Sequence, residues 1–157
     1  MSKPLALIVE DNIDLAAIMA VALQGAGFEV ETIHDGARAL ARLAEIVPAL
    51  VILDLHLPHL SGANTLRQIQ TDTRLLNTRV VIATADAAMA DELRDKADLV
   101  LLKPISIAQI RELASRLIPA AHPAPPAGNT GEASPPPGQT APPAGNPGEA
   151  SLPPSQT

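Results

Sequence analysis

Short aliphatic runs recur along the first two thirds of the chain, and stretches with helical periodicity separate them. The runs lie at 5–9, 28–33, 50–53, 80–83 and 99–102. Four of them are apolar throughout, which is typical of strands buried on both faces of a parallel sheet. The second alternates Phe28, Val30 and Thr32 with Glu29 and Glu31, which indicates an edge strand with one solvated face. The pattern predicts an α/β fold built on a five-stranded parallel sheet.

Helices are predicted between and after these strands, over 13–24, 36–46, 64–71, 87–96 and 107–118. Turn and capping residues support their ends. Asp35 is placed to cap the second helix, and Ser106 with Gln109 forms a capping-box pattern before the last one. Gly25 and Gly27 are expected to follow the first helix.

The last quarter of the chain has a different composition. Twelve of the sixteen prolines lie from Pro119 to Pro154, and residues 124–140 and 141–157 form a tandem 17-residue repeat that differs at three positions. Such a segment cannot bury enough apolar surface to offset an ordering entropy of roughly 1–2 kcal/mol per residue. We therefore expect one globular domain over 1–118 and a disordered Pro/Gly-rich tail over 119–157.

Composition excludes several classes of function. The chain has no cysteine, so disulfides and thiolate metal sites are excluded, which suits a reducing cytosol. A formal charge of −6 and a single aromatic residue argue against nucleic-acid binding. No apolar run reaches the length of a membrane helix. A cytoplasmic protein with no membrane or nucleic-acid partner is expected.

Polar residues follow four of the predicted strands. Glu10 and Asp11 come after the first, Asp54 after the third, Thr84 after the fourth and Lys103 after the fifth. Carboxyl ends of parallel strands meet at one edge of a sheet, so these groups should converge there. Two carboxylates about 5 Å apart repel by roughly 3 kcal/mol at an effective dielectric near 20, and one lysine cannot balance three of them. Oxygen ligands without cysteine favour Mg²⁺, or Mn²⁺, as the balancing cation. An aspartate beside such a cation can serve as a nucleophile toward phosphorus.

These residues resemble the receiver domains of two-component response regulators, and the resemblance spans roughly residues 5–118. It rests on the acidic pair, on Asp54 in Leu-Asp-Leu-His-Leu-Pro, on Thr84-Ala85 and on Lys103-Pro104. It implies a flavodoxin-like fold with strand order 2-1-3-4-5 and phosphorylation of Asp54 with the help of Thr84 and Lys103. It implies metal ligation by Glu10, Asp11, Asp54 and the backbone carbonyl of His56, and a cis Lys103-Pro104 bond. The implied phosphodonor is a sensor histidine kinase or phosphotransfer protein. We therefore expect a regulator without an output domain that acts by binding a protein target or by passing phosphoryl groups along a phosphorelay. We expect no enzymatic activity beyond its own phosphorylation and dephosphorylation.

The sequence departs from the receiver pattern in two places. Val100 stands where receivers usually carry a Tyr or Phe that couples phosphorylation to the output face. The interval from Thr84 to Lys103 is also short, which predicts a truncated fourth helix. His56 lies two residues after Asp54, where an imidazole could steer water toward an acyl phosphate or have no kinetic role. No role is assigned to His34, His59 and His122.

Two other functions are open at this stage. A constitutive docking module, independent of phosphorylation, is favoured by Val100 and disfavoured by the complete acidic site. A phosphatase of the haloacid-dehalogenase type also uses an aspartyl nucleophile, but it carries a second Asp where His56 stands here. No phosphate-binding glycine loop follows the first strand.

Overall fold

A computed structural model describes residues 2–117 of the chain. Strands and helices alternate along it, with one short 3₁₀ helix, η1, inserted before the fourth strand. In chain order the elements are β1 (Leu5–Val9), α1 (Ile13–Gly25), β2 (Glu29–Ile33), α2 (Gly36–Leu43), β3 (Leu50–Asp54), α3 (Gly62–Thr71), η1 (Thr73–Leu75), β4 (Arg79–Thr84), α4 (Ala87–Leu93), β5 (Leu99–Leu102) and α5 (Ile107–Leu117). The expected tail and its repeat lie outside the described residues.

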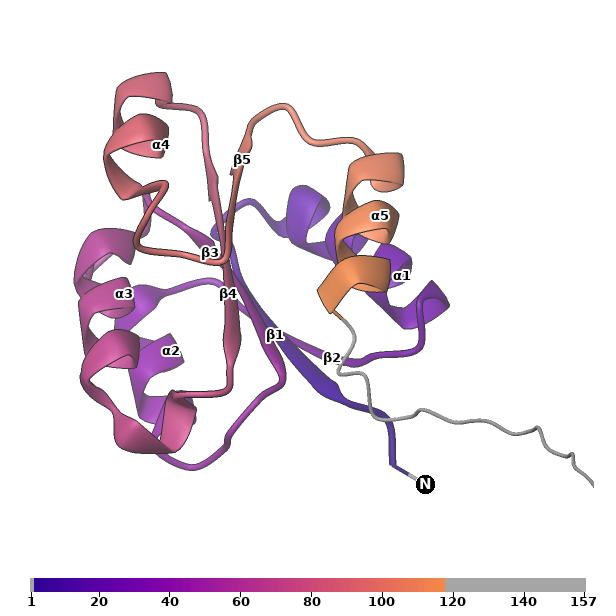
Figure 1. The fold of residues 1–157 in the computed structure, drawn as a ribbon, viewed down its shortest axis with the longest axis horizontal. Coiled ribbons are helices and arrows are strands. Elements are labelled where there is room, and N and C mark those ends of the chain that lie inside the picture. The colour runs from indigo at the N-terminus through magenta and orange to yellow at the C-terminus, as the bar shows by residue number, and fades with distance from the viewer. Residues whose placement is uncertain (1, 118–157) are drawn as a thin grey trace, which may run out of the picture. The chain divides into compact units, whose positions relative to one another are not determined.

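The strands form one parallel sheet in the order β2-β1-β3-β4-β5. This is the predicted flavodoxin-like fold, with α1 and α5 on one face of the sheet and α2, α3 and α4 on the other (Figure 1). The strand order reverses between β1 and β3, so the crevice of the fold opens at the carboxyl ends of these two strands. No helix within residues 2–117 has the length and apolar character needed to cross a bilayer.

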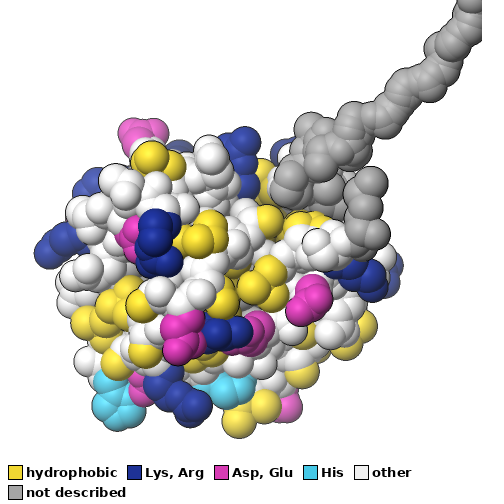
Figure 2. Space-filling view, turned by 90° about the horizontal axis from the view of Figure 1, so that it is seen from below, with side chains coloured by type: hydrophobic (Ala, Val, Ile, Leu, Met, Phe, Trp, Pro, Cys, Tyr) yellow, Lys and Arg dark blue, Asp and Glu magenta, His cyan; other side chains and the backbone are white. Residues whose placement is uncertain are grey.

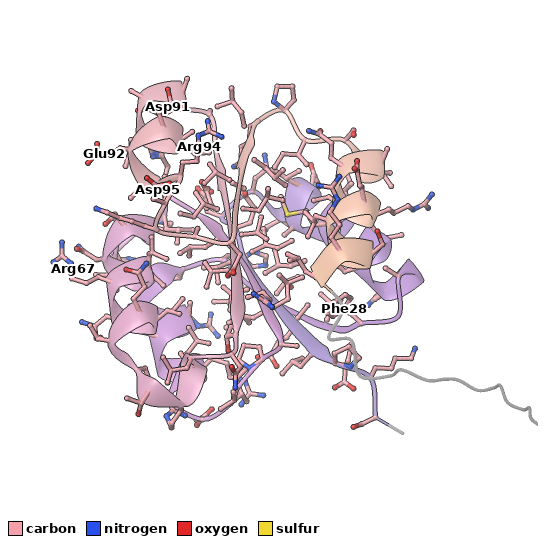
Figure 3. The ribbon with its side chains drawn as sticks, viewed as in Figure 1. Phe28, Arg67, Asp91, Glu92, Arg94 and Asp95 are labelled. Atoms are coloured by element: carbon pink, nitrogen blue, oxygen red, sulfur yellow. The ribbon has the colours of Figure 1, made fainter. Side chains whose placement is uncertain are left out.

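Two apolar clusters hold the helices against the sheet. Alternate residues of β1 and β3 point to opposite faces, as strand geometry requires, so Ile8 belongs to the α1/α5 cluster and Leu7 to the α2/α3 cluster. Phe28, the only aromatic residue, is buried immediately before β2 in the first of these clusters (Figure 3). Arg67 on α3 and Glu92 on α4 point away from the sheet (Figure 3).

The prediction that β2 lies at a sheet edge is confirmed, but the burial of residues in both edge strands differs from the expectation. Thr32 was predicted to share the buried face of β2, yet it is exposed, and Glu31 is half-buried because Arg42 holds its carboxylate at 2.6 and 3.1 Å. The prediction that the last strand is buried on both faces is wrong: β5 is half-buried and Leu102 is 47% exposed. Aliphatic composition alone does not distinguish a central strand from an edge strand that has only one neighbour.

Caps were predicted better than helix ends. Asp35 accepts a hydrogen bond from the Arg38 N–H at 3.0 Å, and the Ser106–Gln109 capping box forms with bonds of 3.1 and 2.8 Å. The predicted helices over 36–46 and 87–96 end earlier, at Leu43 and Leu93, where their last turns tighten. Helix α4 is therefore seven residues long, which confirms the truncation expected there.

Candidate functional site

Three carboxylates meet at the crevice where the strand order reverses. Glu10 and Asp11 follow β1 and Asp54 ends β3, and these strands are neighbours in the sheet. One ligand oxygen from each of the three lies within 4.8 Å of the other two. Glu10 is 1% exposed and Asp54 is 4% exposed, whereas Asp11 faces solvent. The predicted convergence of the acidic residues is therefore present.

Lys103 supplies the positive charge at this cluster. Its Nζ lies 2.8 Å from Glu10 Oε2 and 3.4 Å from Asp54 Oδ2. Burial works against the ammonium, but the hydrogen bond to Glu10 and the charges of both carboxylates raise the pKa of Lys103 overall. Burial, together with the charge of Asp54, raises the pKa of Glu10 despite the hydrogen bond from Lys103. Negative charge is thus crowded here beyond what one ammonium balances.

The donor set fits a hard divalent cation. The three ligand atoms are all carboxylate oxygens, one of the residues faces solvent, and no cysteine exists in the chain. Mg²⁺ binds through one or two carboxylates while keeping several waters, and Mn²⁺ accepts the same ligands. The surplus of negative charge at largely buried oxygens gives such an ion a strong electrostatic reason to bind.

Two further predicted residues lie beside the cluster. The backbone N–H of His56 donates to Asp54 Oδ1 at 3.2 Å, while its side chain is exposed. Thr84 is fully buried at the end of β4, and its hydroxyl accepts a hydrogen bond from the Asp86 N–H at 3.0 Å. The Lys103 N–H donates to the Thr84 carbonyl at 2.7 Å, so the ends of β4 and β5 are tied together. The Lys103–Pro104 bond is cis, as expected.

Gly62 positions the segment that follows Asp54. A Cβ atom at Gly62 would lie 2.1 Å from the Asp54 carbonyl oxygen and 2.5 Å from Leu55 Cα. The Gly62 N–H donates to the Leu55 carbonyl at 3.0 Å. The first turn of α3 therefore packs directly on the backbone of Asp54, which only a residue without a side chain permits. The predicted helix over 64–71 begins two residues earlier, at Gly62, so sequence reasoning left this glycine outside the helix and assigned it no role.

Sequence reasoning also missed three residues that contact the site or its loops. The Asn12 N–H donates to Glu10 Oε1 at 3.2 Å. His34 Nδ1 contacts the Glu10 carbonyl oxygen at 2.8 Å, and His59 Nδ1 contacts Asp35 Oδ2. The two histidines each lie 24 residues from their partners and meet them only when loops after different strands pack together, so no sequence signal reveals these two pairs.

A comparison with protein families decides the assignment. The family model described as "Response regulator receiver domain" matches residues 6–115. The chain belongs to this family. The receiver is 33% identical over 114 residues to the DNA-binding response regulator MtrA of Mycolicibacterium paratuberculosis, an alignment covering 71% of this chain and 48% of MtrA. It thus spans about half the length of this curated relative.

Solved structures agree with the fold. A response regulator receiver domain (CheY-like) from Methylobacillus flagellatus is 26% identical, with a TM-score of 0.67 over 74% of this chain and 99% of that one. The chemotaxis response regulator CheY4 of Vibrio cholerae, 24% identical, superposes with a TM-score of 0.68 over 74% of this chain and 99% of that one and supports the fold alone. Because the chain belongs to the receiver family, the alternative of a haloacid-dehalogenase phosphatase is set aside.

Proposed function

We propose that this receiver accepts a phosphoryl group on Asp54 from a phosphohistidine of a sensor kinase or phosphotransfer protein. The observation that carries the proposal is the position of Asp54: its carboxylate is nearly buried, Lys103 lies 3.4 Å away, and Glu10 and Asp11 complete a set of oxygens suited to Mg²⁺. In the transfer, an Asp54 oxygen forms the new P–O bond as the P–N bond breaks, and the imidazole leaves with the electron pair.

The residues around Asp54 have separate roles in this proposal. The His56 N–H holds one oxygen of Asp54, which leaves the other to attack. Lys103 is placed to stabilise charge on the phosphoryl oxygens, and Thr84 to meet one of them with its hydroxyl. Glu10, Asp11, Asp54 and the His56 carbonyl would hold Mg²⁺, which supplies charge neutralisation on the phosphoryl group when bound. No further catalytic activity is proposed beyond hydrolysis of the receiver's own acyl phosphate.

A protein phosphodonor is supported by the surface next to Lys103. A shallow groove of about 540 Å³ runs between the start of α1 and the segment after β5. Its walls are mostly apolar and include Leu15, Ile18, Pro104 and Ile105. An apolar groove that reaches Lys103, which lies 3.4 Å from Asp54, can hold a helix of a donor protein, whereas a small phosphodonor would need no such surface.

The output partner is proposed to be a protein. On the face shown in Figure 2, Lys and Arg side chains lie next to Asp and Glu and do not gather into one basic area. The relative MtrA is described as DNA-binding, and the receiver matches only part of it. The expectations that this chain has no output domain and binds no nucleic acid therefore stay predictions.

Phosphorylation is tested by incubating the full chain with acetyl phosphate and Mg²⁺ and following the intact mass. We expect the mass of one added phosphoryl group in the wild type, and no added mass in Asp54→Asn or in the presence of EDTA. Asp14→Asn is the control: it removes an exposed acid on α1 outside the three-carboxylate cluster and should still be phosphorylated. Phosphorylation of Asp54→Asn at the wild-type level would contradict the proposal.

A constitutive docking role is the second candidate, and Val100 is the observation that favours it. Val100 is half-buried on β5 and packs with Met89 and Ala97 against the α2/α3 cluster, so no large ring is present there to change position. Equal affinity for a captured protein target in the wild type and in Asp54→Asn, under phosphorylating conditions, would support this alternative.

A further inference from the structure

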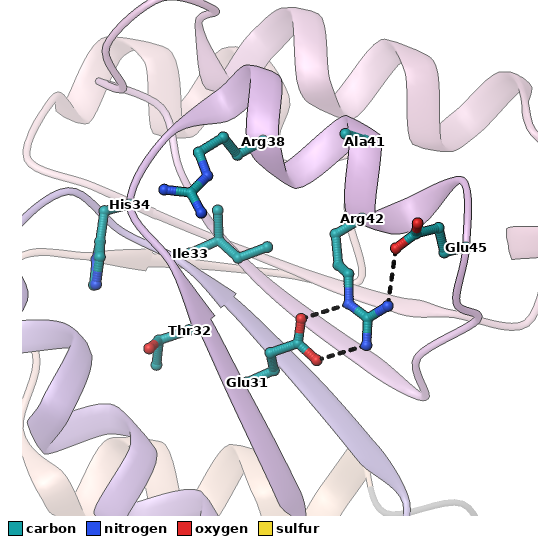
Figure 4. A pocket seen from close by; sticks show the side chains of 8 residues that line it. All are labelled: Glu31, Thr32, Ile33, His34, Arg38, Ala41, Arg42 and Glu45. Carbon is teal, nitrogen blue, oxygen red and sulfur yellow. Dashed lines mark hydrogen bonds and ion pairs between the residues drawn. The ribbon is translucent and has the colours of Figure 1, made fainter.

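His34 lies just beyond the end of β2 and contacts the acidic pair through the backbone. Its Nδ1 is 2.8 Å from the carbonyl oxygen of Glu10, and the ring is half-buried. A carbonyl oxygen can only accept a hydrogen bond, so Nδ1 must carry the proton and donate it. A groove lies between β2 and α2, and in Figure 4 His34 stands at the opposite end of this groove from the Arg42 guanidinium.

This hydrogen bond completes the attachment of Glu10 to β2. The regular β1–β2 pairing ends at Val9 and Ile33. Beyond it, the Glu10 N–H donates to the Ile33 carbonyl at 3.0 Å, and His34 binds the Glu10 carbonyl. Both backbone polar groups of Glu10 are therefore held by the end of the neighbouring strand, at the position where the chain leaves the sheet.

The same carbonyl sets the orientation of Asp11. The Glu10 C=O and the Asp11 N–H belong to one planar peptide unit, so holding the oxygen restricts the direction in which the Asp11 backbone departs. Within residues 2–117, the Asp11 carboxylate makes no hydrogen bond or ion pair, whereas Glu10 is held through both of its side-chain oxygens. The placement of Asp11 near the other two carboxylates thus depends on its backbone.

We infer that His34 is a positioning residue for the metal site: by binding the Glu10 carbonyl, it holds the Glu10–Asp11 peptide so that the Asp11 carboxylate faces Glu10 and Asp54. The inference rests on the proposed function, because it concerns the Mg²⁺ that would bind there. It assigns a role to a histidine that follows a different strand, is remote from Asp11 in sequence and is not itself a ligand.

The test compares substitutions that keep or remove the donor. His34→Leu removes it, whereas His34→Asn places an amide N–H near the position of Nδ1. Outer partners of metal ligands commonly contribute 10- to 100-fold in affinity, so we expect about tenfold weaker Mg²⁺ binding by calorimetry in the Leu variant and recovery of most of it in the Asn variant. Thr32→Val is the matched control, since it alters an exposed side chain of the same groove with no contact to Glu10.

Two readouts separate positioning from a general effect on stability. At saturating Mg²⁺ the phosphorylation rate of His34→Leu should approach that of the wild type, while the Mg²⁺ concentration at half-maximal rate rises. In metal-free protein, the Asp11 amide resonance should shift in the Leu variant and return in the Asn variant. If His34→Leu does not fold, His34→Gln replaces it, because its longer side chain places the amide nitrogen nearer the position of Nε2.

The possible failures are distinguishable. Wild-type protein that binds no Mg²⁺ would refute the proposed function and the inference with it. Wild-type protein that binds Mg²⁺ with the same affinity as His34→Leu, and with the same Asp11 amide resonance, would refute the inference alone.

Discussion

Substituting Gly62 with alanine should damage the fold at Asp54, the proposed phosphoacceptor. The new Cβ would lie 2.1 Å from the Asp54 carbonyl oxygen, 2.5 Å from Leu55 Cα and 2.9 Å from the Asp54 carbonyl carbon. All three are backbone atoms of the end of β3 and the residue after it, so no side-chain rotation relieves the contact. Helix α3 or the end of β3 has to move.

The size of the effect follows from these distances. The closest contact must lengthen by 0.9 Å to reach even 3.0 Å, the limit below which Cβ contacts are essentially never seen. Overpacking usually costs about 1–3 kcal/mol, and a clash with rigid backbone belongs at the upper end, so we expect a loss of about 3 kcal/mol in the free energy of unfolding. Urea titration followed by far-ultraviolet circular dichroism measures it.

Gly25→Ala is the matched control. Gly25 is the last residue of α1, and a Cβ there meets nothing within 4 Å. Alanine is better than glycine in a helix by roughly 0.5–1 kcal/mol, so this variant should be as stable as the wild type or slightly more so. If Gly62→Ala unfolds at the wild-type urea concentration and is phosphorylated at the wild-type rate, the close packing of α3 on Asp54 is not a constraint and the reasoning is wrong.

Three other substitutions test separate parts of the structure. Lys103→Met leaves the 1% exposed Glu10 without its cation and should cost about 3 kcal/mol in the free energy of unfolding, with partial recovery in Mg²⁺; equal urea midpoints would contradict this. Hydrogen bonding from the Arg38 N–H lowers the pKa of Asp35, so its charge stabilises the fold at neutral pH and that contribution is lost as acid protonates it. The urea midpoint of Asp35→Asn should therefore lie below that of the wild type at pH 7 and approach it below about pH 4. A difference between the two midpoints that stays constant over this pH range would refute the stabilising role of the Asp35 charge. Ser106→Ala removes the cap of α5 and should lower the free energy of unfolding by about 1 kcal/mol, measured by the same urea titration. An unchanged urea midpoint would show that the capping box does not stabilise the fold.

The sheet and its functional edge could be predicted because they depend on local patterns. Aliphatic runs define the strands, and a residue that follows a strand is carried to the carboxyl edge whatever its neighbours are. That is why Glu10, Asp11, Asp54 and Lys103 could be placed together from the sequence, and why their distances agree with the expectation.

What could not be predicted depends on contacts between segments. The exposure of Leu102 and Thr32 follows from the place of β5 and β2 at the sheet edges, where each strand has one neighbour. The role of Gly62 depends on how closely α3 approaches the Asp54 backbone. The contact of His34 with Glu10 depends on the loop after β2 reaching across to β1. None of these features has a periodicity or a local motif.

Position 100 carries a valine and no aromatic ring, so the hydrogen bonds at the edge of the sheet are the contacts that can link Asp54 to α4. The proposed metal ion or phosphoryl group at Asp54 would change the charge beside Lys103, whose ammonium contacts Glu10 and Asp54. The Lys103 N–H is bonded to the Thr84 carbonyl, and the Thr84 hydroxyl is bonded to the Asp86 N–H that begins α4. If the Thr84 hydroxyl oxygen moves toward a phosphoryl group, it gives up the Asp86 N–H, and Asp86 is the residue whose side chain caps a helix only seven residues long. A short helix has few intrahelical bonds to resist such a loss, so in this receiver the start of α4 is the element that phosphorylation should move first.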